Sequence, residues 1–282
     1  MGKTKRPEPE SLDLPPVGVD SHAHLDLEDF DEDRETIIRR ALDSGVSRIV
    51  NVFLGPDAYE RGHGLFDGHP EISFIMGVHP NNADDLTDEV LTRMRDLFKA
   101  DPRLKGVGEI GLDYYWERVP HDVQKDAFVR QMDLARELSL PIIIHSRAAN
   151  DDTAAILETE GFKDYPLLWH CFGAGIDLAE RVVANGWHIS IPGPVTFRKK
   201  SDDVQAAVAR IPFDRLLLET DCPYLLPRNL PAKLKGRRHE PALLPWIVRE
   251  IAHWRDLDEQ ALAEATTATA RAFFRLPDGT AD

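Results

Sequence analysis

Two histidines stand one residue apart near the start of the chain, in the stretch DSHAHLD at residues 20–26. This stretch follows the short apolar run PPVGV, which is typical of a β-strand. In an extended segment residues i and i+2 point to the same side, so His22 and His24 aim their imidazoles at one point while Ala23 faces away. Imidazole is a common ligand of zinc and similar metals. The pair therefore predicts a metal site at the end of the first strand.

Four further polar residues follow later apolar segments. Glu109 stands in GVGEIGLD, His145 ends PIIIHSR, His170 ends LLWHCFGAG, and Asp221 stands in LLLETDCPYL. Together with the first pair they offer six nitrogen and oxygen ligands, too many for one catalytic metal that keeps an open position. They suit two divalent metals about 3.5–4 Å apart that share a carboxylate. Zinc, magnesium, manganese, nickel and iron all accept such ligands.

The two carboxylates have different predicted roles. Glu109 is the predicted bridge between the metals, because its strand lies between the first strand and those of His145 and His170 in chain order. Asp221 is the candidate general base, since a ligating carboxylate can also accept the proton of an attacking water. Both residues are therefore predicted to be catalytic.

These residues need a scaffold that brings five strand ends to one face. Apolar segments rich in β-branched residues alternate with segments of helical period. The predicted strands cover residues 17–20, 47–52, 72–76, 104–108, 141–144, 167–169, 187–191 and 215–219. The predicted helices cover 32–43, 86–99, 121–139, 150–160, 176–185, 202–210, 241–254 and 258–274, and 57–68 is a poorer, Gly-rich helix.

Eight strands, each followed by a helix or a long loop, predict an α/β fold of the (β/α)8 TIM-barrel type. An open doubly wound sheet is the alternative, but it needs a glycine-rich phosphate loop after the first strand, and DSHAHLD has none. In a TIM barrel the active-site residues lie at the carboxyl ends of the strands. We predict one domain over residues 17–276, a disordered tail at 1–16 and a short tail at 277–282.

Composition excludes several classes of protein. The 282 residues are 42% apolar and 29% charged, which is ordinary for a globular protein. No apolar run reaches the roughly 18–20 residues that span a bilayer, and no apolar segment follows the basic residues of the N-terminus, which argues against a secretory signal. Cys171 and Cys222 have no C-x-x-C spacing, which argues against a disulfide framework. We expect a cytoplasmic protein with no membrane contact and no obligate protein partner.

The formal net charge of −15 argues against a protein that coats nucleic acid with its whole surface. It leaves room for a local basic site. Residues 228–238 read RNLPAKLKGRR, with no acid, and begin seven residues after Asp221. Two interpretations are open for this predicted loop. It is a phosphate clamp, extended by RKK at 198–200, or a solvated loop; the clamp residues would be Arg228, Lys233, Lys235, Arg237 and Arg238.

Two more side chains are candidates for contact with substrate. His79 ends the third predicted strand in GVHP, where it would either touch substrate or orient a metal ligand. Arg147 follows His145 by two residues and faces the same side by strand alternation. It pairs either with a substrate phosphate or with a nearby acid.

The motifs DSHAHLD, GVHP, GEIGLDYY, PIIIHSR, HCFGAG, LLLETDCPYL and RRHEPALLP, in this order, resemble the motif series of the TatD family. Members of this family are metal-dependent hydrolases, mostly described as deoxyribonucleases, on a (β/α)8 barrel. The resemblance covers about residues 18–274 and implies hydrolysis of DNA or another phosphodiester, with a nucleotide released from a DNA end. It also implies two groups of ligands that share Glu109: His22, His24 and Asp221 in one, His145 and His170 in the other.

The chain departs from the usual family pattern at three positions. Gly173 replaces a serine in HCFGAG, His239 replaces an asparagine in RHEP, and Cys222 stands where serine or alanine is common. None of the three is a predicted ligand, but the first two bear on substrate contacts.

Two other functions remain open. An amidohydrolase-like enzyme acting on a carboxylic ester or amide also begins with H-x-H. Many two-metal members of that group bridge the metals with a modified lysine on strand four, whereas here strand four carries Glu109, with Lys105 near its start. A noncatalytic metal-binding scaffold is disfavoured by six convergent ligands.

Overall fold

The computed structural model describes residues 14–197, 202–234, 236 and 238–277. Eight strands form one parallel sheet in the order of the sequence. The strands are β1 (Val19–Ala23), β2 (Arg48–Leu54), β3 (Ile72–Gly77), β4 (Leu104–Asp113), β5 (Ile142–Arg147), β6 (Leu167–Trp169), β7 (His188–Ile191) and β8 (Leu216–Leu218).

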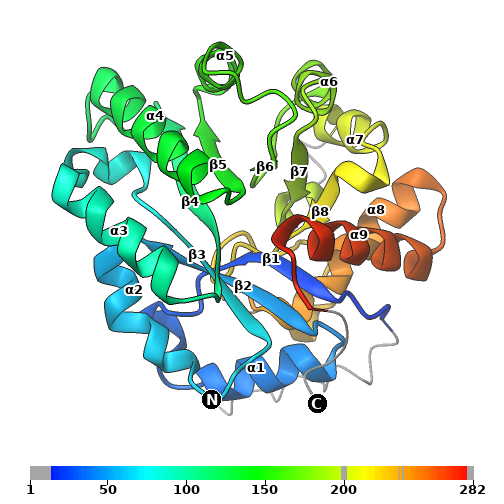
Figure 1. Cartoon of the computed structure of the whole chain (residues 1–282). Coiled ribbons are helices and arrows are strands. Elements are labelled where there is room, and N and C mark those ends of the chain that lie inside the picture. The colour runs from blue at the N-terminus through cyan, green and yellow to red at the C-terminus, as the bar shows by residue number, and fades with distance from the viewer. Residues whose placement is uncertain (1–13, 198–201, 235, 237, 278–282) are drawn as a thin grey trace.

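Helices surround the strands on the outside (Figure 1). They are α1 (Arg34–Asp43), α2 (Pro56–Gly62), α3 (Asp88–Ala100), α4 (His121–Leu138), α5 (Asn150–Thr159), α6 (Ile176–Ala184), α7 (Asp202–Val208), α8 (Pro245–Arg255) and α9 (Glu259–Phe274). The predicted TIM-barrel fold is thereby confirmed, and each predicted strand and helix overlaps an observed one.

The last strand returns to the first and nearly closes the barrel. Just after β8, Asp221 donates its backbone N–H to the His22 carbonyl at 2.9 Å. The His24 N–H in turn donates to the Cys222 carbonyl at 2.9 Å, beside an isolated bridge between Ala23 and Cys222. These bonds place the chain after β8 directly against the end of β1, where the predicted ligands stand.

Alternate residues of the strands face two different layers. On β5, Ile142 and Ile144 pack in the layer between the sheet and the outer helices, whereas Ile143 faces the barrel interior. Interior strand residues pack with Phe273 and Phe274 of α9. Since α9 contacts the residues that precede β1 and β8, it covers the amino-terminal end of the barrel. The predicted ligands lie at the opposite, carboxyl end of the barrel.

Two elements differ from their predicted form. β4 continues to Asp113, five residues beyond the prediction, because Ile110 to Asp113 pair in register with β5. The weak helix at 57–68 is a short α2 followed by a 3-10 turn at His63–Phe66. Gly108 and Gly111 interrupt the apolar run of β4, but pairing with β5 continues the strand.

The predicted tails lie mostly outside the described residues, which exclude 1–13 and 278–282. Leu14 packs against Leu230 and Leu234, and Pro15 is buried, so these residues contact the barrel. Among the described helices, none combines the length and apolar character needed to cross a bilayer.

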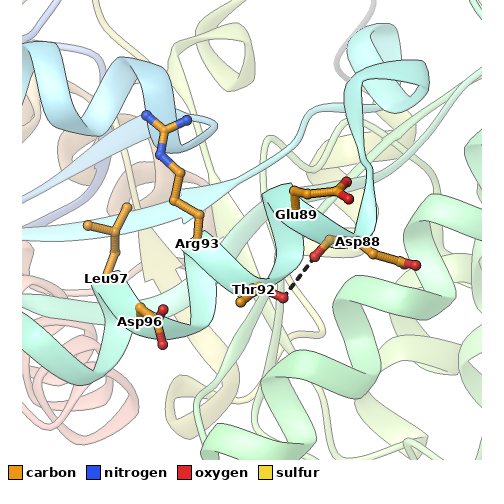
Figure 2. Close-up of a pocket in the computed structure, with 6 residues that line it drawn as sticks. All are labelled: Asp88, Glu89, Thr92, Arg93, Asp96 and Leu97. Carbon is orange, nitrogen blue, oxygen red and sulfur yellow. Dashed lines mark hydrogen bonds between the residues drawn. The ribbon is translucent and has the colours of Figure 1, made fainter.

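A surface hollow of about 450 Å³ lies along α3, in the outer helix layer (Figure 2). Its lining residues are Asp88, Glu89, Thr92, Arg93, Asp96 and Leu97. Arg93 forms ion pairs with Asp57 and Glu60 of α2. None of the predicted ligands lines this hollow, and Arg93 pairs with none of them.

Candidate metal centre

The six predicted ligands converge around the carboxylate of Glu109. Its Oε1 lies 2.5 Å from Nδ1 of His145 and 2.8 Å from Nε2 of His170. Its Oε2 lies 3.5 Å from Nε2 of His22. Each oxygen thus faces a different group of histidines, which is the arrangement that lets one carboxylate bridge two metals.

Asp221 completes the side of the centre next to β1. Its Oδ1 lies 3.3 Å from Nε2 of His24 and 3.8 Å from Nε2 of His22. The Asp221 side chain is 14% exposed, more than the other carboxylate of the centre, Glu109 at 6%. Asp221 therefore combines contact with the histidines and access from solvent.

The donor set fits divalent metals. His22 is fully buried, and neither of its ring nitrogens has a hydrogen-bond partner among the described residues. An imidazole buried in this way is costly unless something else binds its nitrogens. Histidine and carboxylate atoms around His22 lie close enough to share a cation, as in the cluster of His22, His24 and Glu109 and that of Glu109, His145 and His170. A metal ion would bind one of the two ring nitrogens of His22.

Local sequence explains the position of Glu109. The pairing of β4 with β5 shifts register between Val107 and Ile110, and such an irregularity re-aims the side chains within it. Gly111, two residues after Glu109, has a φ of +139°, and a Cβ there would lie 2.1 Å from the His145 carbonyl oxygen. Only glycine permits this close approach. The motif GEIGLD therefore keeps Glu109 and His145 together.

Asp20 fixes the relation between β1 and β8. This buried carboxylate accepts hydrogen bonds from the Thr220 backbone N–H at 2.9 Å and from the Thr220 hydroxyl at 2.6 Å. Burial raises the pKa of Asp20 to about 7. Asp221 follows with a φ of +54°, a left-handed conformation that aspartate tolerates. The residues between Asp20 and His24 are thus held opposite Asp221.

Both carboxylates of the centre are ionised at neutral pH. Burial alone would raise the pKa of Glu109, but His170 and His145 hold it well below its ordinary value. Burial likewise opposes ionisation of Asp221, and the hydrogen bond from His24 and the charges nearby lower its pKa. Two anionic carboxylates in a buried pocket create a strong demand for positive charge.

The pKa values of the histidines around these carboxylates shift in opposite directions. Burial, followed by the nearby His170, lowers the pKa of His22, whose ring stacks on that of His170 with centroids 4.0 Å apart. The pKa values of His145 and His170 are raised: burial opposes their charge, and Glu109 overcomes it. Metal binding would displace these protons, because a ligating histidine nitrogen must be deprotonated.

Two buried carboxylates near the centre were missed by the sequence analysis. Asp113 Oδ2 lies 3.2 Å from Nε2 of His145. Glu219 Oε1 lies 3.6 Å from Nδ1 of His170, and the carboxylate accepts from the backbone N–H of Cys171 at 2.6 Å. Each faces the histidine nitrogen turned away from Glu109 and so orients the ring. Strand alternation was the available signal, since Asp113 follows Glu109 by four residues in the same strand.

His79 lies inside the centre. Its Nε2 is 3.6 Å from Oε1 of Glu109, and its ring centroid is 4.4 Å from that of His145. Its Nδ1 accepts the backbone N–H of Asn81 at 3.1 Å, so Nε2 carries the proton. Burial lowers the pKa of His79 to about 4, which keeps the ring neutral. His79 therefore presents an N–H donor to the centre.

The arginines predicted to contact substrate have different surroundings. Arg147 is exposed and forms no ion pair within the described part of the chain; its guanidinium lies 4.0 Å from the Tyr115 ring centroid. Arg228 is exposed over the ring of Phe197 at 4.2 Å. Arg238 differs, because its Nη2 pairs with Asp33 Oδ2 at 2.6 Å.

Other predicted clamp residues lie outside the described residues: Lys235, Arg237 and the stretch 198–200. The side chain of Lys233 is also undescribed. Of the residues that depart from the family pattern, His239 is buried and its Nδ1 accepts the Glu240 N–H, and a Cβ on Gly173 would meet nothing closer than 4.0 Å. A serine would fit at Gly173.

Replacing Glu109 with Gln is expected to reduce bound metal below two ions per chain, because a neutral amide bridges two cations poorly. Elemental analysis of the purified variant measures this directly. Glu71→Gln is the matched control, since Glu71 is also buried and faces a histidine, His69, at 2.8 Å, away from the centre. Two ions per chain in Glu109→Gln would contradict the bridging role.

Known proteins match the chain over nearly its whole length. The sequence profile of the family described as TatD related DNase matches residues 19–275. A Bacillus subtilis protein named uncharacterized metal-dependent hydrolase YabD is 37% identical, over 91% of this chain and 98% of its own. A Pantoea vagans protein named 3'-5' ssDNA/RNA exonuclease TatD is 35% identical, over 91% of this chain and 99% of its own.

Solved structures agree in fold. The TatD homologue YJJV from Escherichia coli K12 has a TM-score of 0.84 and 26% identity, covering 93% of this chain and 99% of that one. A hydrolase of the TatD family from Entamoeba histolytica has a TM-score of 0.81 at 18% identity, covering 92% of this chain and 98% of that one, which shows the fold alone. The profile match and the identities above 30% establish that this chain belongs to the TatD family of metal-dependent hydrolases.

Proposed function

We propose that the chain is a TatD-type deoxyribonuclease that hydrolyses phosphodiester bonds in DNA and releases nucleotides from a strand end. The observation that carries this proposal is the two-sided carboxylate of Glu109, whose oxygens face separate groups of histidines. The names of relatives at about 35% identity, 3'-5' ssDNA/RNA exonuclease TatD, support nucleic acid as the substrate class.

The proposed ligand assignment follows the distances. His22, His24 and Asp221 would hold one ion, and His145 and His170 the other, with Glu109 shared between them. Zinc, magnesium, manganese and nickel are the candidate ions. When bound, two such ions lower the pKa of a water and polarise the phosphate oxygens.

The side chains supply the remaining chemistry. Asp221 is ionised and partly accessible, so it accepts the proton of the water that attacks phosphorus. As the P–O bond to the leaving strand breaks, the leaving oxygen takes up a proton from solvent water, and the Nε2–H of His79 donates a hydrogen bond to a phosphate oxygen. Asp113 and Glu219 hold His145 and His170 in one orientation throughout.

A substrate screen tests this function. Protein loaded with metal is incubated with end-labelled single-stranded DNA, duplex DNA, RNA and carboxylic esters and amides. DNA products that shorten one nucleotide at a time from one end are expected. Ester or amide hydrolysis without cleavage of nucleic acid would establish the amidohydrolase-like alternative instead. Lys105, the second residue of β4, lies near the end of that strand opposite the centre, which favours the first outcome.

Arg147→Ala is expected to raise KM for DNA several-fold and leave metal content unchanged, because Arg147 is an exposed cation without an ion pair among the described residues. Steady-state kinetics and elemental analysis measure the two quantities. Arg93→Ala is the control, since Arg93 lines the hollow along α3 and pairs with Asp57 and Glu60 rather than with a residue of the centre. An unchanged KM in Arg147→Ala would remove the substrate role.

The basic loop is proposed as a phosphate clamp, and Arg228 is its testable member. Arg228→Ser is expected to lower the slope of log K against log salt for DNA binding by about one, the effect of losing one phosphate contact. Hydrolysis of a small phosphodiester that does not reach the loop should change little. Binding titrations across salt concentrations measure the slope, and an unchanged slope would leave a solvated loop.

Arg238 also has a structural role, because it contacts the segment that follows β1. Besides its ion pair with Asp33, it donates to the Asp29 carbonyl and lies 4.6 Å from the Phe30 ring centroid. These contacts tie the segment after β8 to the segment after β1.

A cytoplasmic location is also proposed, in keeping with the free thiols of Cys171 and Cys222.

A further inference from the structure

Two exposed aromatic side chains stand beside the metal centre. Tyr115 is 57% exposed and Trp116 is 43% exposed, both in the loop between β4 and α4. Their rings meet edge to face with centroids 4.9 Å apart. Large adjacent aromatic surfaces left in water mark binding sites more often than isolated apolar residues do. We call these two residues the aromatic pair.

A buried carboxylate fixes the aromatic pair relative to the centre. Asp113 Oδ1 accepts the backbone N–H of Tyr115 at 3.0 Å and that of Trp116 at 3.2 Å. The other oxygen of Asp113 faces His145, which in turn contacts Glu109. Asp113 therefore lies between the aromatic pair and His145, and it holds the backbone of the pair in a defined position next to the metal centre.

An exposed cation accompanies the aromatic pair. The Arg147 guanidinium lies 4.0 Å from the ring centroid of Tyr115 and 5.7 Å from that of Trp116. Arg118 lies 5.4 Å from the Trp116 centroid. In the part of the chain that the structure describes, Arg147 has no carboxylate partner, so its charge is available to an anion. Flat rings beside an available cation suit a ligand with a planar face and a phosphate.

We propose that Tyr115, Trp116 and Arg147 form a stacking subsite for an unpaired base of the nucleic acid whose phosphodiester is cut at the metal centre. This inference rests on the proposed function and adds the side chains that would hold a base of the single-stranded substrate named for relatives. A base in a duplex already stacks on neighbours with both faces, whereas an unpaired base has a face to offer an aromatic ring. Every base has such a face, so the subsite binds without regard to sequence.

The test replaces the rings and keeps the apolar bulk. The variant is Tyr115→Leu with Trp116→Leu, and it leaves the backbone bonds to Asp113 in place. Its affinity for a labelled single strand is measured by fluorescence anisotropy, and its KM and kcat by product release. A second strand of equal length carries abasic residues at its last positions.

The double variant should bind the base-bearing strand about tenfold more weakly or worse, the scale of losing base–aromatic stacking. KM should rise with it, whereas kcat and affinity for the abasic strand should stay near wild type. Tyr115→Phe with Trp116→Phe should retain most of the affinity, because its rings still stack. Phe213→Ala is the matched control, since Phe213 is 37% exposed beneath Arg255 at 4.3 Å but lies before β8, at the other end of the barrel.

The outcomes separate the two proposals. Wild-type protein that cleaves no nucleic acid would refute the proposed function and the subsite with it. Wild-type protein that cleaves DNA, while the Leu variant binds both strands as wild type does, would refute the subsite alone. Equal losses on base-bearing and abasic strands would also refute it, because damage to the loop, rather than lost stacking, would then explain the effect.

Discussion

Removing divalent metals with a chelator is expected to abolish hydrolysis of DNA, and adding zinc, magnesium, manganese or nickel is expected to restore it. The buried cluster around Glu109 consists of histidines and carboxylates, none of which is placed as an independent nucleophile. Hydrolysis therefore depends on a water whose pKa is lowered by metal. Activity is measured against metal content by elemental analysis, and recovery is expected to be complete only near two equivalents per chain.

The same experiment has a second readout in stability. Metal binds only the folded arrangement of His22, Glu109 and their neighbours, so loading should raise the melting temperature. At a free metal concentration of 100 times Kd the gain is about 2.7 kcal/mol. Circular dichroism of the metal-free protein controls for unfolding. Full activity in protein shown to be free of metal would overturn the two-metal proposal.

The positions of the histidines were predictable because strand geometry is simple. His22 and His24 follow the two-residue period of β1, and the apolar runs before His145 and His170 marked buried strands. The barrel then brings every carboxyl end to one face. These are local patterns combined with one rule of topology, so the sequence alone contains them.

Contacts between distant segments were not predictable in this way. The basic stretch at 228–238 contains no acid of its own, but Arg238 pairs with Asp33, which lies 205 residues earlier. Asp113 faces His145 because pairing with β5 continues β4 five residues beyond the predicted strand. Propensity carries no information about such pairings, because they are decided by packing between elements.

The two carboxylates of the centre differ in how many of their oxygens contact histidines and in their exposure to solvent. Glu109 is enclosed by His145, His170 and His22, so both of its oxygens are committed to neighbours. Asp221 has one oxygen facing His22 and His24 and is the more exposed of the two. A residue that moves a proton needs an accessible oxygen, which favours Asp221 over Glu109 as the base.

Replacing Asp221 with Asn should therefore lower kcat for DNA by about 10²-fold or more, the scale of losing a general base. The fold should survive, because asparagine has nearly the same volume and also tolerates the left-handed backbone at φ +54°. The backbone N–H to the His22 carbonyl is unaffected. Most of the metal should be retained through the histidines and Glu109, as measured by elemental analysis beside the kinetics.

Asp164→Asn provides the matched control for this change. Asp164 also has a left-handed backbone, with φ +59°, but it is exposed and precedes β6, at the barrel end away from the centre. The same chemical substitution in the same backbone conformation should leave kcat unchanged there. A large loss in Asp221→Asn with metal retained would then isolate the carboxylate charge as the cause. Wild-type turnover in Asp221→Asn would assign the proton to another acceptor and remove Asp221 as the base.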